Sequence, residues 1–338
     1  MRSTVRRALL ATALFLIPAA TVAEDAPKPA APAAAANAPV QDWSKDIETV
    51  VVTVDNRGPL IWHVQKGDSE LYILGIVTPV PETLEWRTGG VEAALKGASQ
   101  LLLPPQASVG LFEGVWFLMW NRDAIYLPSS TTMESTLPAD LSARFTKVRD
   151  SLHRDADRYS DLRVPLAGLR LAGDFQKSAG LDYRKVSKML DRLASRAHVK
   201  SKPIATYEAL PLVKQLPKMS PAANAACMKA ALDDIEVQRV HAEPAAEAWA
   251  VGDLDGIKAN YSDTRFESCI QSMPSFSALF DRAVRDSTNA ANAALARKGK
   301  TLMVVSMGEL LRRGGLLERL RAEGVTVDPP SNQALPPA

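Results

Sequence analysis

Residues 59–78 constrain the fold more than any other part of the chain. They contain an apolar stretch with a tryptophan (60–64), a Lys-Gly-Asp-Ser turn (66–69) and a second apolar stretch (70–77). Two apolar runs joined by a short glycine-containing turn predict a β-hairpin. The second strand of this hairpin runs into Gly75. We therefore expect a β-sheet that is built on this N-terminal hairpin.

The composition is that of an ordinary globular protein. The chain has 338 residues, of which 46% are hydrophobic and 23% charged, enough for a sizeable core. No internal repeat and no composition break occurs after the first forty residues, so we expect a single domain at 42–328. An Ala/Pro-rich stretch at 24–41 predicts a disordered linker, and 329–338 a flexible tail.

The first 23 residues have the pattern of a secretory signal peptide. Three arginines precede an apolar stretch at 8–20, and Thr21-Val22-Ala23 supplies the small residues of a cleavage site after Ala23. The apolar stretch is shorter than the roughly 20 residues that a membrane-spanning helix needs. We therefore expect a periplasmic or secreted protein without a membrane span after cleavage.

The charge of the mature chain is close to zero. The 40 Lys and Arg include the three arginines of residues 1–23, which leaves 37 basic against 38 acidic side chains, a net charge of −1. This balance gives no indication of a nucleic-acid partner. The sequence does not identify the partner, which could be a protein, a peptide or a polysaccharide.

The chain contains two cysteines, Cys227 and Cys269. In an oxidising compartment an even number of cysteines favours a disulfide, and each of the two lies in a predicted helix. The alternative is a pair of buried thiols. Two cysteines without histidines at ligand spacing do not make a zinc site.

The remaining patterns predict an α+β fold, with a small mixed sheet surrounded by many helices. Helical periodicity is clear in 185–197 and in a long region at 221–251, where Pro244 is expected to kink or divide the helix. Short apolar runs predict further strands, at 50–54, 100–103, 202–206, 301–306 and 325–327.

Several short sequences resemble the TraB/GumN family, whose relatives include Tiki-like and erythromycin-esterase-like proteins. The hairpin, Trp-Arg-Thr at 86–88 and Lys-Pro-Ile at 202–204 occur in the order typical of that family. The same holds for the sequences at 180–182, 248–253, 299–305 and 315–317. The resemblance covers nearly all of the mature chain, and it implies the fold of that family.

The resemblance also implies a metal site, which this chain does not reproduce. Active family members are thought to hold a divalent metal with histidines of two Gly-x-x-His motifs and an acid that follows a sheet strand. Here the first motif reads Gly75-Ile76-Val77-Thr78, so Thr78 replaces the histidine. The acid position is Pro104. The second motif reads Ser306-Met307-Gly308-Glu309, with Glu309 in place of histidine, and the usual Arg-Asn pair is Arg285-Asp286.

These replacements predict a pseudoenzyme that needs no cofactor. Threonine and proline are poor or impossible ligands for such a metal, and a single carboxylate does not make a catalytic site. The sequence therefore favours a catalytically degenerate protein that binds a partner in a vestigial cleft. The alternative is a divergent metal-dependent hydrolase, most plausibly a peptidase, that uses Glu309 with other acids.

One apolar helix predicted at 109–120 has two interpretations. Its aromatic residues Trp116, Phe117 and Trp120 either pack in the core or form a lid or partner-binding face beside the cleft. The histidine on the first strand, His63, is expected to be a surface residue rather than a ligand.

Overall fold

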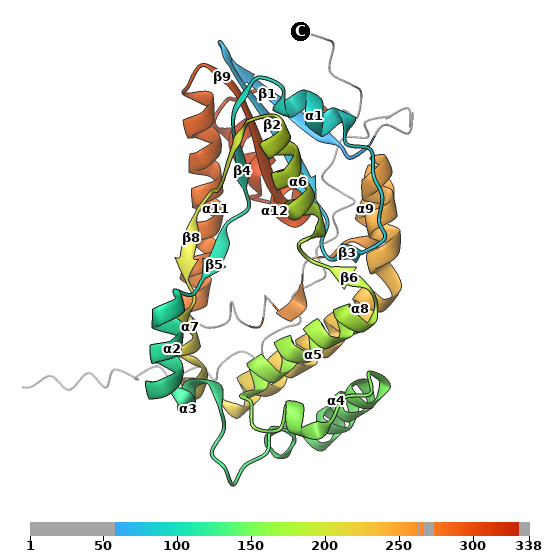
Figure 1. The fold of residues 1–338 in the computed structure, drawn as a ribbon, viewed down its shortest axis with the longest axis vertical. Helices are drawn as coiled ribbons and strands as arrows, with labels where there is room; N and C mark the ends of the chain where they lie inside the picture. Colours follow the sequence, from blue (N-terminus) through green and yellow to red (C-terminus); the bar gives the residue numbers. More distant parts are fainter. Residues whose placement is uncertain (1–57, 263, 267–268, 270–273, 331–338) are drawn as a thin grey trace, which may run out of the picture. The chain divides into compact units, whose positions relative to one another are not determined.

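The computed structural model describes residues 58–262, 264–266, 269 and 274–330. The predicted signal peptide, the linker at 24–41, the strand at 50–54 and the end of the tail lie outside these residues. The predicted fold class is confirmed: a small mixed sheet carries the N-terminal hairpin and is surrounded by helices (Figure 1). Among the described residues, none of the helices combines the length and the apolar composition that a membrane crossing requires.

The central sheet has five strands in the order β1-β2-β9-β4-β7. The hairpin pairs β1 with β2 in antiparallel fashion, and β2, β9, β4 and β7 run parallel to one another. The strands are β1 (Ile61–Lys66), β2 (Ser69–Ile76), β9 (Gly299–Ser306), β4 (Ala98–Leu103) and β7 (Lys200–Pro203). Strands β2 and β9 lie in the middle and are almost entirely buried, as expected for parallel strands that are covered on both faces.

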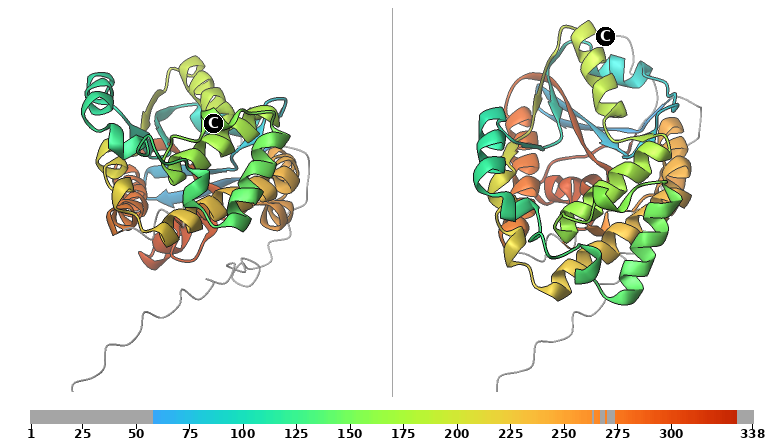
Figure 2. Two further views of the ribbon diagram at one scale, coloured as in Figure 1. Left: turned by 90° about the horizontal axis from the view of Figure 1, so that it is seen from below. Right: turned by 60° about the horizontal axis from the view of Figure 1, so that its bottom comes forward.

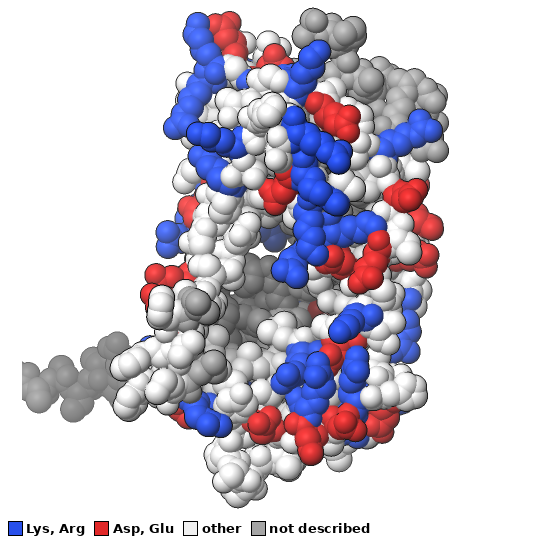
Figure 3. All heavy atoms as spheres, in the orientation of Figure 1, with Lys and Arg blue, Asp and Glu red and all other residues white. Residues whose placement is uncertain are grey.

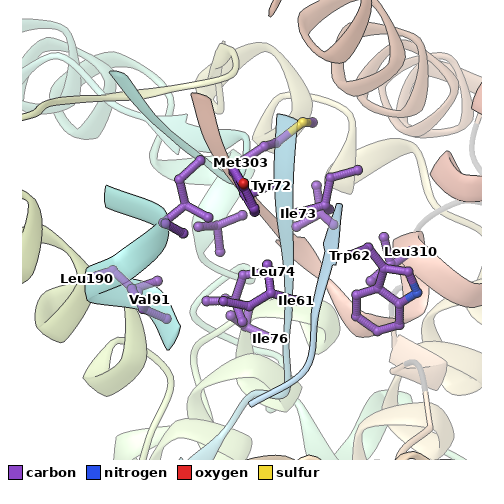
Figure 4. Packing of buried hydrophobic residues seen from close by; sticks show 14 of the residues in the cluster. Ile61, Trp62, Tyr72, Ile73, Leu74, Ile76, Val91, Leu190, Met303 and Leu310 are labelled. Carbon is purple, nitrogen blue, oxygen red and sulfur yellow. The ribbon is translucent and has the colours of Figure 1, made fainter. Parts of the chain in front are cut away.

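Helices cover the two faces of the sheet. In Figure 4, Val91 and Leu190 lie on one side of β2, whereas Trp62 and Leu310 lie on the other. The first pair belongs to α1 (Gly89–Leu95) and α6 (Lys185–Arg196). The opposite face is covered by α11 (Pro274–Leu295), α12 (Met307–Leu311) and α13 (Leu316–Ala322).

A second apolar core holds three helices together, α4 (Ala139–Ser151), α5 (Val164–Ser178) and α8 (Pro221–Val251). Figure 2 shows the green α4 and α5 beside the yellow α8. The core includes Phe145 of α4, Leu171 of α5 and Leu232 of α8, each fully buried.

The remaining elements are short and connect these layers. The strands pair as β3 (Val80–Pro81) with β6 (Leu181–Asp182), and β5 (Gln106–Ser108) with β8 (Thr206–Glu208). The helices are α2 (Leu111–Trp120), α3 (Arg122–Ile125), α7 (Leu210–Val213), α9 (Leu254–Asn260) and the 3-10 turns η2 (Glu134–Thr136), η3 (Ala156–Arg158) and η4 (Leu216–Lys218). Residues 325–327 form only an isolated bridge between Val327 and Val64, not the predicted strand.

Helix α8 has defined ends and is not divided at Pro244. The hydroxyl of Ser220 accepts a hydrogen bond from the amide of Ala223, and Gly252 ends the helix in the left-handed conformation. Proline deprives the carbonyl four residues earlier of its partner, and that residue, Val240, is exposed. Exposure to water accounts for the tolerance of proline inside this helix.

Cys227 and Cys269 form a disulfide in the structure, with their Cα atoms 5.2 Å apart. The bridge lies against the buried side chains of Ala231 and Phe266. The sequence prediction is therefore confirmed, and the alternative of two thiols is wrong.

Candidate functional site

The motif positions lie at the carboxyl edge of the parallel strands. In the register of the sheet, Gly75 pairs with Val305 and Ile76 with Ser306, so β2 and β9 end side by side. Strand β4 runs parallel on the other side of β9 and ends one residue before Pro104. Thr78, Pro104 and Glu309 thus all follow strands that end at one edge of the sheet, the position at which open parallel sheets usually bind ligands.

Gly75 is required by packing at this edge. A Cβ atom on Gly75 would lie 2.8 Å from Cδ2 of Leu310 and 3.0 Å from the sulfur of Met307, closer than normal contact. The carbonyl oxygen of Gly75 accepts a buried hydrogen bond of 2.7 Å from the indole nitrogen of Trp249. The motif glycine therefore lets α12 and α8 approach β2 closely, independently of any chemistry.

The second motif makes the turn from β9 into α12. Ser306 is the N-cap of α12, and its hydroxyl accepts a hydrogen bond of 3.0 Å from the amide of Glu309. Met307 and Gly308 are buried, which fixes the start of the helix against the sheet. The cap sets the position from which the Glu309 side chain extends.

The carboxyl group of Glu309 lies in a desolvated position. Burial raises the pKa of this carboxyl, while the hydroxyl of Ser287 and the positive charge of Arg312 oppose the shift. Its Oε1 atom and the Oγ atom of Ser287 are both buried, and neither makes a hydrogen bond of normal geometry with the described residues. Burial therefore makes ionisation of Glu309 more costly than it is in water.

A polar network adjoins Glu309. The hydroxyl of Tyr207 donates a hydrogen bond of 2.8 Å to Oδ2 of Asp286, and the guanidinium of Arg282 lies 5.5 Å from the centre of the Tyr207 ring. Burial, the hydrogen bond to Asp286 and the charge of Asp286 raise the pKa of Tyr207, and the charge of Glu309 adds to this shift. Sequence reasoning missed Tyr207 and Ser287. Tyr207 could have been found as a polar residue shortly after a predicted strand of the same sheet.

The other two motif positions have different surroundings. Thr78 lines a small pocket together with His241 and Asp234 of α8 and Asn260 of α9. The space measures about 30 Å³, which suits a few water molecules rather than a substrate. Pro104 is half-buried and leads into β5, and Arg285 is exposed on α11.

The residues at the edge do not fit a divalent metal. Thr78 and Pro104 supply no carboxylate, imidazole or thiolate. The groups that affect the pKa of Glu309 are the hydroxyl of Ser287 and the guanidinium of Arg312. Within the described ranges, no three His, Cys, Asp or Glu residues lie together in a way that could hold a metal ion. We therefore derive no reaction step through a metal. His63 does not lie at this edge but bonds Asp328 of the C-terminal segment beside β1, with 2.8 Å between Nδ1 and Oδ2.

The apolar helix α2 presents most of its side chains to solvent. Phe112 is 88% exposed, and Trp116 and Trp120 are 64% and 67% exposed. Together with Val115 and Met119, they form what we call the α2 aromatic surface. Among the aromatic side chains of this helix, Phe117 alone is buried. The interpretation as core packing is therefore confirmed for Phe117 and wrong for Trp116 and Trp120. The two tryptophan rings lie 5.6 Å apart.

The α2 aromatic surface lies beyond the paired strands β5 and β8, which lead away from the sheet edge that carries the motifs (Figure 1). Strand β5 follows Pro104 and pairs with β8, and α2 begins three residues after β5. A pocket beside α2 is lined by Trp116 and Phe117 together with Glu208, Leu210 and Lys214.

Comparison with known proteins identifies the family. Residues 60–329 match the family model described as the TraB/PrgY/gumN family. The chain belongs to this family. The match to the TraB/PrgY/gumN family begins at the hairpin and extends beyond α13, so it includes the sheet, its carboxyl edge and α2. Neither a curated protein nor a solved structure matches the chain.

Proposed function

We propose that this protein is an exported, catalytically degenerate member of the TraB/PrgY/gumN family. It binds an apolar segment of a peptide or protein partner on the α2 aromatic surface. The observation that carries this proposal is the α2 aromatic surface, which is exposed next to a pocket between α2 and α7. Large exposed apolar patches on a folded protein are characteristic of interaction sites.

The chemistry of the motif residues supports a loss of catalysis. A metal-dependent hydrolase needs a metal with an open coordination position and a water molecule that the metal activates. Thr78 and Pro104 supply none of the ligands, and burial favours the protonated form of Glu309, which is a poor ligand. The retained glycine and serine of the motifs have structural roles here.

Aromatic side chains are suited to the proposed role. Tryptophan offers a large, rigid contact area at a low cost in conformational entropy and is enriched among residues that dominate binding energy. Trp116 and Trp120 lie one helical turn apart, so one extended or helical segment could contact both. Lys214 adds a positive charge at the rim of the adjacent pocket.

Selection from a random peptide library displayed on phage tests this role. We expect the purified protein to select peptides with aromatic or branched apolar residues. The Trp116→Ser/Trp120→Ser variant should lose the selected peptide, whereas the control Leu169→Ser/Val240→Ser, which removes two other exposed apolar side chains, should retain it. Selection of no peptide, or equal binding by both variants, would contradict the role.

N-terminal sequencing of the periplasmic protein tests export, because a chain that starts at Glu24 is expected.

A hydrolase remains the second candidate, because Glu309 has one catalytic property. Buried carboxyls with raised pKa values occur often in active sites, and a serine hydroxyl lies beside this one. A general peptidase screen of wild type beside Glu309→Gln separates the two candidates. Hydrolysis that disappears in Glu309→Gln would favour the hydrolase, and no hydrolysis by either protein would favour the binding function.

A further inference from the structure

Helix α6 and its cap carry a row of four cations on one face. Arg184 is the N-cap, and Lys188, Arg192 and Arg196 follow at intervals of four residues. Residues four apart lie above one another on a helix, so these side chains form a line about 18 Å long. All four are exposed. We call them the α6 basic row, and Figure 3 shows Lys and Arg gathered over the region of α6.

The row is largely uncompensated. Lys188 pairs with Asp182, with 3.0 Å between Nζ and Oδ2, and Arg192 donates a hydrogen bond to the sulfur of Met189. Within the described part of the chain, Arg184 and Arg196 have no carboxylate within ion-pair distance of their guanidinium groups. Residues 184–202 contain seven Lys and Arg but one acid, Asp191. The near-zero charge of the whole chain conceals this local excess.

Such a row is unfavourable to the helix itself. Like charges at a spacing of four residues destabilise a helix by about 0.2–0.5 kcal/mol per pair. Exposed helices usually alternate charges of both signs along a face. The buried face of α6, with Val186, Leu190 and Leu193, supplies the packing that holds the helix in place. The row is therefore a feature that the fold tolerates and that an anionic partner would stabilise.

Two further lysines extend the row. Lys200 and Lys202 are exposed on β7, which follows α6 and forms the edge of the sheet. Lysines on an edge strand also prevent edge-to-edge aggregation. Those of β7 are therefore no independent indication of an anionic partner.

We propose that the α6 basic row binds an acidic polysaccharide. Arginine guanidinium groups hold carboxylates and sulfates through paired hydrogen bonds, and a straight row of cations matches a polymer with regularly spaced anions. Asp191 and Ser195 lie beside the row by helical position and can accept hydrogen bonds from sugar hydroxyls.

Other anionic partners fit the row less well. The large apolar residues of α6 face the core, so the helix has none to insert into a membrane, as interfacial helices do. Recognition of a peptide uses backbone pairing or apolar pockets, and the row supplies neither. This proposal does not depend on the function proposed for α2, because the two surfaces belong to different elements.

Binding of the full-length mature protein to immobilised polygalacturonate tests the proposal, with neutral dextran as the uncharged control. The test variant is Arg184→Gln/Arg192→Gln/Arg196→Gln. The matched control, Lys147→Gln/Lys218→Gln/Arg321→Gln, removes three exposed cations from elsewhere. Parallel measurements use phosphatidylglycerol vesicles and duplex DNA, and the thermal melting of each variant shows that it is folded.

We expect wild type and the control variant to bind polygalacturonate but not dextran. The test variant should bind polygalacturonate about tenfold more weakly or not at all, at an unchanged melting temperature. Absence of polygalacturonate binding by wild type, or equal weakening in both variants, would overturn the proposal. Tighter binding to the vesicles or to DNA than to polygalacturonate would also overturn it, by showing that the row serves another partner.

Discussion

The indole nitrogen of Trp249 donates a buried hydrogen bond of 2.7 Å to the carbonyl oxygen of Gly75. The bond ties α8 to the end of β2, three residues before Thr78. Trp249 is fully buried and also contacts the ring of Trp86 edge to face. The two residues thus hold this sheet edge together.

Replacing Trp249 with phenylalanine should destabilise the protein. The substitution keeps most of the apolar volume but leaves the Gly75 carbonyl oxygen buried without its donor, at a cost of about 1–3 kcal/mol. Urea unfolding followed by circular dichroism measures this loss. Trp120→Phe is the control, because Trp120 is exposed and its replacement should change the unfolding free energy by less than about 0.5 kcal/mol. Equal effects of the two substitutions would contradict the role of the bond.

Gly75→Ala should also destabilise the fold. The added methyl group would press on the buried ends of Leu310 and Met307, and overpacking of this kind costs about 1–3 kcal/mol. Gly173→Ala in α5 is the matched control, because a Cβ there meets no atom within 4 Å. That control should stabilise the protein by about 0.4–1 kcal/mol. A Gly75→Ala protein as stable as wild type would show that α12 does not need the glycine.

Glu309→Gln should stabilise the protein at neutral pH. Burial raises the pKa of Glu309 above its ordinary value of 4.5, so the folded state holds its proton at a pH where the unfolded state has released it. At higher pH this difference lowers the free energy of unfolding. The loss disappears below about pH 4.5, where the folded and unfolded states both hold the proton. We expect a melting temperature about 2–4 °C above wild type at pH 7 and no difference at pH 4.

The exposed Glu243→Gln is the control for Glu309 and should show no such pH-dependent difference. Wild type more stable than Glu309→Gln at pH 7 would mean that the carboxylate has a favourable partner at the sheet edge.

The two sides of α2 should respond differently to truncation. Phe117 is 4% exposed, and Phe117→Ala should cost about 3–5 kcal/mol of unfolding free energy. Phe112→Ala, at an exposed position of the same helix, should change it by less than about 0.5 kcal/mol. A large loss in Phe112→Ala would show that the α2 aromatic surface is packed against another part of the chain.

The sequence predicted the elements whose patterns are local. The hairpin, the buried runs of β4 and β9 and the long helix α8 follow from apolar periodicity and turn residues. The disulfide followed from the number of cysteines. The effect of Pro244 was not predicted correctly, because the helix is not divided there. The carbonyl that loses its hydrogen-bond partner belongs to Val240, and the sequence does not show that Val240 is exposed.

The surroundings of the site could not be predicted in the same way, because they depend on contacts between distant segments. Ser287 of α11 and Tyr207 of β8 come near Glu309 only through the order of the strands and helices. The exposure of Trp116 and Trp120 depends on how α2 leaves β5, which apolar content alone does not reveal. The α6 basic row was hidden by the balance of charge along the chain.

We propose that the sheet edge keeps the family fold without metal chemistry. Calorimetric titration of the purified, metal-free mature protein with Zn²⁺ and Mn²⁺ tests this most directly, with Glu309→Gln measured alongside. We expect no stoichiometric binding by wild type and no difference between the two proteins, because Thr78 and Pro104 supply no ligand and the single carboxyl of Glu309 does not make a metal site. One equivalent of metal bound by wild type and lost in Glu309→Gln would contradict it.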